Sequence, residues 1–456
     1  MDYLLCIVSV RFGLVLHMSV VLCLKPNPEQ KVTEVLLVEI LKRKKCSERE
    51  ILYCGLFYPN ILIVALLSHY AYYYHVFYGD YNNCIGLVVL AAFCMICGYL
   101  LNCFIRLSVR KWRYGTQREE VIKLVIQSDT LKKFAGGFIL VGVIAHVVYY
   151  AKNPVASYAS SYTASRGNGY ITVFFNFWIL GMILLEYLSI NRKNGRLLKY
   201  GNRLLIVIYT LLYVVILLKR RQVIVLFLAL YAIWGSVMNR RQKLLMYILG
   251  VCVVCGFMIM GTMRADIERY GFFGAMPYFV DKFSWEWLSM KRFEGSYISK
   301  TLSDVYGYVR SVGYDPSILL GVLFCMVPRR LLGGAKPLAF PEWYTKHFYP
   351  AEYVRGTGFA GSMVAELYLI GGVPLLAAGY FLIGFISAWI QRNAEKQNNG
   401  CSLLVYSLFI HTIFLMPRYD LATLLIEVCF MYFPILLTCR KCMRMRYDGS
   451  TEGNMR

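Results

Sequence analysis

Three cations interrupt one of the most apolar parts of the sequence. Lys219, Arg220 and Arg221 lie between two uncharged runs, the fifteen residues of Leu204–Leu218 and the sixteen of Val223–Met238. Ionisable side chains at membrane depth are costly, so each is a functional hypothesis by default. Arginine stays ionised and offers parallel N–H donors, which makes it a binder of anionic oxygens. In the alternative interpretation the three side chains only extend to lipid headgroups.

The composition places these cations in a membrane protein. The chain has 456 residues, 58% of them hydrophobic, and soluble domains do not carry that much apolar surface. No cleavable signal peptide is evident, so the apolar N-terminus is interpreted as the first span. Transmembrane segments must be helices, because lipid offers no partner to an unpaired backbone group. Eleven candidate spans lie near 3–24, 51–79, 84–105, 134–151, 170–190, 204–218, 223–238, 244–261, 363–390, 402–417 and 421–438.

The two segments that flank the three cations are short for spans. They are either two thin spans in a tight hairpin or a re-entrant pair, and their composition does not separate these alternatives. Both alternatives place the cations in a turn between two apolar helices.

The basic residues predict the orientation of the spans. Of the 49 Lys and Arg, 30 fall in six segments that lie on one side of an eleven-span chain: 25–50, 106–133, 191–203, 239–243, 391–401 and the tail from Cys439. The positive-inside rule makes that side cytoplasmic. The net charge of +23 is then mostly orienting charge, and a nucleic-acid partner is unnecessary.

This orientation divides the chain into four parts. We expect eight spans in 1–261, a large extracytoplasmic loop in 262–362, three spans in 363–438 and a basic cytoplasmic tail in 439–456. The large loop holds one cysteine, Cys325, so no disulfide can form within it.

Two shorter segments are predicted to be helices outside the spans. The apolar segment 316–327 is too short to cross a bilayer and is interpreted as a re-entrant or interfacial helix. In the cytoplasmic connections, 118–127 places Val121, Leu124 and Val125 on one helical face, as an interfacial helix would.

The end of the large loop carries the clearest motifs. A Pro-Arg and a Lys-Pro are followed by a glycine-rich stretch, a Ser-x-x-x-Glu-x-Tyr helix start and a Gly-Gly pair. The residues are Pro328, Arg329, Lys336, Pro337, Gly356, Gly358, Ser362, Glu366, Tyr368, Gly371 and Gly372. With these motifs, and with arginines in the outward turn of an apolar hairpin, the chain resembles the bacterial oligosaccharide repeat-unit polymerases, the Wzy-type O-antigen and capsule polymerases. The resemblance covers the second half best, and the first two hundred residues match only in architecture.

The resemblance implies an all-α polytopic membrane glycosyltransferase. Such an enzyme joins undecaprenyl-diphosphate-linked oligosaccharides at the outer face of the bacterial plasma membrane, with membrane lipids and a chain-length regulator as further partners. A departing diphosphate gathers negative charge, which arginines can stabilise without a metal. No DxD, HExxH or GxxxxGK[ST] motif is present, and we expect no metal and no cofactor. The alternatives are a lipid-linked glycan flippase, which would show internal repeats, and an O-antigen ligase, which shares the late loop.

Ten residues are predicted to form the site. Arg220, Arg221 and Arg264 would stabilise the diphosphate, and Glu366 would accept the proton of the acceptor hydroxyl. The alternative for Glu366 is an ion pair with a nearby arginine, and the alternative base is His347. Arg355 would bind anions beside the start of a helix capped by Ser362, where N–H groups are free. The substrate-binding set is Lys219, Arg166, Arg355, Gly356, Gly358 and His347.

Overall fold

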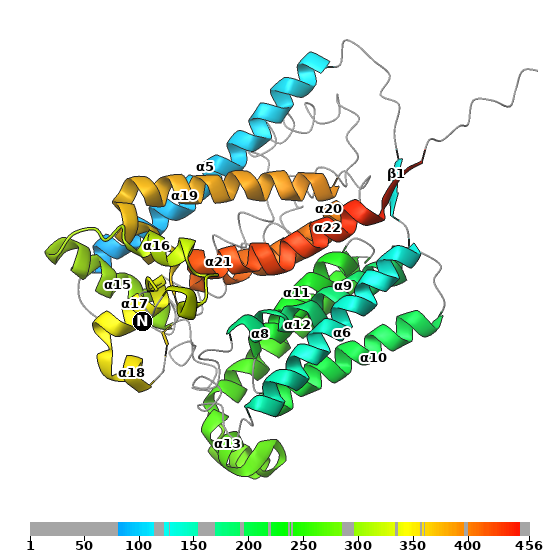
Figure 1. Cartoon of the computed structure of the whole chain (residues 1–456), viewed down its shortest axis with the longest axis horizontal. Coiled ribbons are helices and arrows are strands. Elements are labelled where there is room, and N and C mark those ends of the chain that lie inside the picture. Colours follow the sequence, from blue (N-terminus) through cyan, green and yellow to red (C-terminus); the bar gives the residue numbers. More distant parts are fainter. Residues whose placement is uncertain are drawn as a thin grey trace, which may run out of the picture.

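The computed structural model is a bundle of long helices with a cluster of short helices at one end and a two-stranded ribbon at the other (Figure 1). We call these the loop end and the strand end of the bundle. The structure describes residues 81–113, 123–126, 128–153, 169–191, 196–217, 220–235, 238, 240–284, 296–332, 336–355, 358–359, 361–395 and 400–446.

The elements follow the order of the chain. The first part contains α5 (Tyr81–Arg113), β1 (Lys123–Ile126), α6 (Ser128–Lys152), α8 (Gly169–Val173), α9 (Phe175–Asn191), α10 (Arg196–Leu211), a π-helical turn (Leu212–Ile216), α11 (Arg220–Gly235) and α12 (Arg240–Thr262). The loop-end cluster contains α13 (Arg264–Gly274), α14 (Met276–Lys282), α15 (Ser296–Ser311), α16 (Ile318–Leu323), a 3₁₀ turn (Arg329–Leu332), α17 (Phe340–Phe348) and α18 (Pro350–Arg355). The last part contains α19 (Met363–Glu395), α20 (Gly400–Leu415), a 3₁₀ turn (Met416–Arg418), α21 (Leu421–Glu427), a π-helical turn (Val428–Tyr432), α22 (Phe433–Cys442) and β2 (Met443–Arg446).

Seven helical segments in the described part of the chain are long and apolar enough to cross a membrane. They are Cys84–Cys103, Ser128–Lys152, Gly169–Ile190, Leu197–Val214, Met363–Ala394, Cys401–Arg418 and Leu421–Cys442. The prediction of an all-α polytopic membrane protein is therefore confirmed. The predicted segment 223–238 corresponds to α11, a shorter apolar helix, and 244–261 to α12. The predicted spans at 3–24 and 51–79 lie outside the described residues, so the total of about eleven stays a prediction.

Glycines bring the two long helices α5 and α19 into close contact. α19 packs along α5, and a β-carbon on Gly384 would collide with the carbonyl oxygen of Met95, as one on Gly98 would with that of Phe381. In lipid, helices associate mainly through such packing and through polar contacts, because the solvent itself is apolar. At the strand end the same pair is tied by hydrogen bonds, including Tyr99 Oη to Gln391 Oε1 at 2.7 Å.

A kink in α19 separates a short loop-end segment from the rest of this helix. Gly371 and Gly372 leave helical geometry, and Gly372 has φ +67°, a conformation that favours glycine. The kink releases the carbonyl of Leu369, which accepts the N–H of Asp315 at 2.9 Å. The Gly-Gly pair of the sequence motif thus lets the large loop bond to the helix backbone.

The segment predicted to be an interfacial helix at 118–127 is different in the structure. Residues Lys123–Ile126 form β1, which pairs antiparallel with β2, with Lys123 opposite Arg446. The helical prediction was wrong at these residues, since the pairing partner lies more than three hundred positions away and leaves no local signal. The six-residue helix α16 falls within the apolar segment 316–327 and packs against α17 and α21.

Candidate functional site

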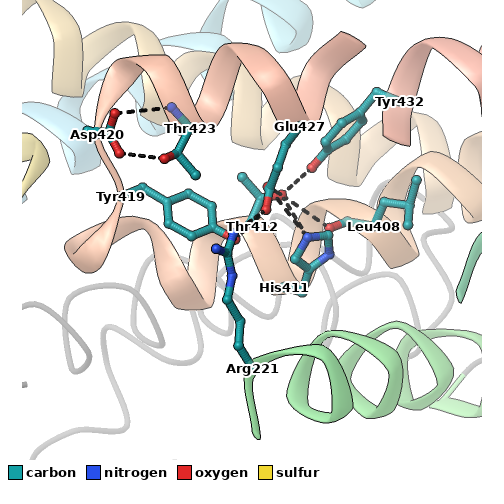
Figure 2. Close-up of polar contacts among 9 residues, drawn as sticks. All are labelled: Arg221, Leu408, His411, Thr412, Tyr419, Asp420, Thr423, Glu427 and Tyr432. Atoms are coloured by element: carbon teal, nitrogen blue, oxygen red, sulfur yellow. Dashed lines mark hydrogen bonds and ion pairs between the residues drawn. The ribbon is translucent and has the colours of Figure 1, made fainter. Parts of the chain in front are cut away.

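Arg221 begins the candidate site, in the first turn of α11 at the loop end. Its Nη2 donates to the hydroxyl of Tyr419 and to Oε1 of Glu427, both at 3.1 Å (Figure 2). The guanidinium also lies over the Tyr419 ring, 5.0 Å from its centroid. The Arg221 side chain is 50% exposed, whereas that of Glu427 is 5% exposed. Among the described residues the arginine is therefore bound at one nitrogen, and half of its side chain is exposed.

Glu427 is the residue that most of the polar contacts share. Its Oε1 accepts the Tyr419 hydroxyl at 2.5 Å, and its Oε2 accepts Thr412 Oγ1 at 3.2 Å. His411 Nε2 lies 3.5 Å from Oε2, and Tyr432 is bonded to Thr412 at 2.6 Å. Figure 2 shows these groups converging from α20, α21 and the turns beside them.

The local backbone explains how Glu427 reaches this position. It is the last residue of α21, and the π-helical turn Val428–Tyr432 follows at once. Insertions of this kind re-aim side chains within a helix and often occur at functional sites. The turn places Glu427 and Tyr432 so that both contact Thr412 on α20.

Two further carboxylates, Asp420 and Glu366, lie beside Tyr419. Asp420 caps α21 by accepting the N–H of Thr423 at 3.2 Å and its hydroxyl at 2.5 Å. Burial raises the pKa of the Asp420 carboxyl. Glu366, in the first turn of α19, accepts the N–H of Leu421 with Oε2 at 2.6 Å. The two carboxylates therefore meet at one turn of the chain.

Glu366 is fully buried, and its second oxygen has no hydrogen-bond partner among the described residues. Most buried polar oxygens accept a hydrogen bond, so Oε1 of Glu366 is an exception among the described residues. The helix that carries Glu366 begins as the sequence predicts, because Ser362 accepts the N–H of Ala365 at 3.4 Å with its side chain. Its backbone carbonyl accepts the N–H of Glu366 at 2.8 Å.

The large loop packs over this region. α16 contacts α21, and Lys336 from the Lys-Pro motif donates to the carbonyl of Cys325 at 2.8 Å. Burial raises the pKa of the Cys325 thiol. The nearby Lys336 charge lowers this pKa in part, and the Asp420 charge raises it further. These neighbours place the Lys336 end of the loop beside the Asp420 turn.

A separate polar network holds the outer helices of the loop together. Asp304 on α15 accepts the hydroxyls of Tyr344 at 2.6 Å and Tyr349 at 3.2 Å, and Lys300 bonds to Tyr349. Burial and the adjacent Asp304 raise the pKa of Tyr344, so its hydroxyl stays a donor. This network ties α15 to α17 within the loop.

No group of three or more metal-ligating side chains that could hold an ion occurs in the described ranges. The chemistry that the arrangement can support there is anion binding by Arg221 and proton acceptance by Glu366. One is a partly open cation and the other a buried carboxylate with an unpartnered oxygen.

A comparison with protein families decides the identity of the chain. Residues 50–446 match the family model described as O-antigen polysaccharide polymerase Wzy. The chain belongs to the Wzy O-antigen polysaccharide polymerase family. No curated protein and no solved structure matched the chain. The match extends over nearly the whole sequence, including residues 50–200, where the sequence resembled these polymerases only in architecture.

The structure of this Wzy-family protein brings two of the predicted site residues to one region. Arg221 on α11 and Glu366 on α19 both form hydrogen bonds to the segment Tyr419–Leu421. Arg220 begins α11 beside Arg221, and Arg264 begins α13 directly after α12. The side chains of both lie outside what the structure describes.

The other predicted residues have no recorded contact with Arg221 or Glu366, or lie outside the described residues. His347 is exposed on α17, where its ring stacks on Trp343 with centroids 5.4 Å apart. Arg355 ends α18, with its side chain outside the description, and Gly358 is exposed between α18 and α19. Lys219, Arg166 and Gly356 lie outside the described residues.

Sequence reasoning missed the residues that surround Arg221 in this Wzy-family protein. They are His411, Thr412, Tyr419, Asp420, Glu427 and Tyr432. One signal was available, because Glu427 is the only charged residue in the predicted span 421–438. An acidic side chain alone in a membrane segment is a functional hypothesis by default. The polar groups on the neighbouring helix carried no such signal.

Proposed function

We propose that this protein polymerises undecaprenyl-diphosphate-linked oligosaccharide repeat units by glycosyl transfer at the outer face of the bacterial inner membrane. The bond between the anomeric carbon of the growing glycan and its diphosphate breaks, and the diphosphate leaves with the electron pair. The hydroxyl oxygen of the terminal sugar on a new lipid-linked repeat forms the glycosidic bond. Membership of the polymerase family supports this activity over the flippase and ligase alternatives.

The observation that carries the proposal is the geometry of Arg221. A guanidinium has five N–H donors, and the two on Nη2 are directed to Tyr419 and Glu427. The three donors on Nε and Nη1 make no hydrogen bond to the described residues. The Nε–H and Nη1–H₂ groups do not share an edge of the guanidinium, so they can donate to phosphate oxygens separately. Arg221 would thereby stabilise the charge that develops on the departing diphosphate.

Glu366 is proposed as the base for the acceptor hydroxyl. Its Oε2 is fixed by the N–H of Leu421, while Oε1 is buried without a partner in the described chain. A fixed carboxylate whose second oxygen makes no hydrogen bond within the described chain can accept a proton as the hydroxyl attacks. Tyr419, in the same turn of the chain, contacts Arg221. The proposed base and the cation are therefore both bonded to the segment Tyr419–Leu421.

The remaining predicted residues are proposed as contributors to substrate binding. Arg220 and Lys219 would add positive charge beside Arg221, and Arg264 and Arg355 would contact diphosphate from the loop end. The mechanism uses no metal, since arginine supplies the charge at the leaving group. A chain-length regulator is proposed as a partner on the same membrane face.

The test is a reconstituted reaction. Purified protein in lipid nanodiscs is supplied with one lipid-diphosphate-linked repeat unit, and products are resolved on a gel. We expect a ladder of increasing polymer length, with one lipid diphosphate released for each new glycosidic bond. Transfer of single glycans to a different acceptor lipid would identify a ligase. In sealed proteoliposomes, movement of intact substrate across the bilayer without new bonds would identify a flippase.

A further inference from the structure

The Arg221 guanidinium is held by a carboxylate that is itself held from several directions. Glu427 accepts hydrogen bonds from Arg221 and Tyr419 on Oε1 and from Thr412 on Oε2, with His411 near Oε2. Neutralising one arginine needs only one carboxylate oxygen. The additional contacts fix the direction in which Oε1 points.

The contacts behind Glu427 extend this constraint into the protein interior. Thr412 is 2% exposed and its Oγ1 lies 2.6 Å from the hydroxyl of Tyr432. His411 is fully buried beside Thr412. The carboxylate is thus bound to buried groups on its inner side, and of its described partners Arg221 is the one with an exposed side chain. Buried charge-assisted networks of this kind restrict side-chain orientation strongly.

We propose that Glu427 is a positioning residue for polymerisation, holding Arg221 Nη2 so that the Nε–H and Nη1–H₂ donors stay available to the lipid diphosphate. Tyr419 has the same role, because its hydroxyl donates to Glu427 and accepts from Arg221. The inference rests on the proposed function of Arg221 as the diphosphate-binding cation. Glu427 acts through Arg221 and does not touch substrate.

A second buried carboxylate provides a matched control. Glu186 on α9 is fully buried and accepts Asn202 Nδ2 at 2.8 Å and Trp234 Nε1 at 2.9 Å. Trp234 lies thirteen residues beyond Arg221 on α11, about 20 Å along the helix. Glu186 therefore joins three helices at the strand end, far from Arg221. Its loss should affect folding but not the orientation of Arg221.

The experiment is a double-mutant cycle on kcat and KM in the nanodisc assay, with Glu427→Gln, Arg221→Lys and the double variant. We expect Glu427→Gln alone to lower kcat by about 10- to 100-fold with little change in KM, since a charge-assisted contact is lost. In the Arg221→Lys background, Glu427→Gln should lower kcat by less than about 3-fold, because no guanidinium is left to position. Additive losses, or a wild-type rate for Glu427→Gln, would overturn the inference.

Two further variants separate positioning from folding. Glu186→Gln should lower the thermal midpoint while keeping the wild-type kcat and KM. Tyr419→Phe removes the bridging hydroxyl without changing any charge, and we expect a loss of about 3- to 10-fold. If Glu427→Gln does not fold, Tyr419→Phe decides, and a wild-type rate there overturns the inference. If the wild-type protein forms no polymer at all, the proposed function fails, and this outcome is distinct from any result of the cycle.

Discussion

Arg221→Ala is the substitution whose effect can be worked out most fully. It removes the three open donors of Nε and Nη1 together with the charge. Loss of a single oxyanion donor lowers the rate by about 10²- to 10³-fold in well-studied enzymes, so we expect at least that loss here. Arg221→Lys should recover only part of the activity, because lysine keeps the charge but not the fork.

The same substitution has a separate cost in stability. Glu427 would lose its arginine, and breaking a buried ion pair costs about 3–5 kcal/mol. The Arg221 side chain is 50% exposed, so water and headgroups can partly replace it, and we expect about 1–2 kcal/mol. The variant should therefore insert and fold while polymer formation is nearly abolished.

The assay measures polymer length on a gel, normalised to the amount of folded protein in the membrane. Arg203→Ala is the control, because Arg203 is an exposed arginine on α10 near the strand end. It should leave the ladder unchanged. A role for Arg221 in headgroup contact alone predicts a different outcome, in which lysine restores full activity and alanine lowers protein level more than rate. Wild-type chain length in Arg221→Ala would refute the proposed mechanism.

Three other predictions follow from the site, the helix packing and the orientation. Glu366→Gln keeps the acceptor for Leu421 N–H but not the base, and its polymerisation rate should fall about 10²- to 10⁴-fold; a wild-type rate would exclude Glu366 as the base. Gly384→Leu should destabilise the protein by about 3 kcal/mol, measured as a lower thermal midpoint, while Gly250→Leu in open space on α12 should not. Among variants lacking native cysteines, an impermeant thiol reagent should modify Gly169→Cys in intact cells but Lys199→Cys only after permeabilisation; the opposite pattern would invert the orientation.

Local charge and motif in the sequence pointed to two residues that the structure brings to one region. Arg221 stood out because a cation within an apolar run needs a partner, and Glu366 stood out through its helix-start motif. The partners of both residues lie on Tyr419–Leu421: Tyr419 is 198 positions from Arg221, and Leu421 is 55 positions from Glu366. Contacts between such distant segments depend on tertiary packing, which a single sequence does not record.

The same limitation explains what was predicted wrongly or overlooked. Val121, Leu124 and Val125 have helical spacing, yet the pairing of β1 with β2 determines the structure at Lys123–Ile126. Glu427 carried a usable signal as a lone acid in a span. Its significance becomes clear only when Arg221 is placed next to it.

In the proposed mechanism, Arg221 binds the lipid diphosphate through its Nε–H and Nη1–H₂ donors. The most direct measurement is the affinity of nanodisc-embedded protein for undecaprenyl diphosphate in wild type, Arg221→Ala and Glu366→Gln. We predict that Arg221→Ala weakens binding by roughly 10- to 100-fold, as expected for a lost charge-assisted contact, while Glu366→Gln binds like wild type. Equal affinity of Arg221→Ala and wild type for the diphosphate would contradict the claim.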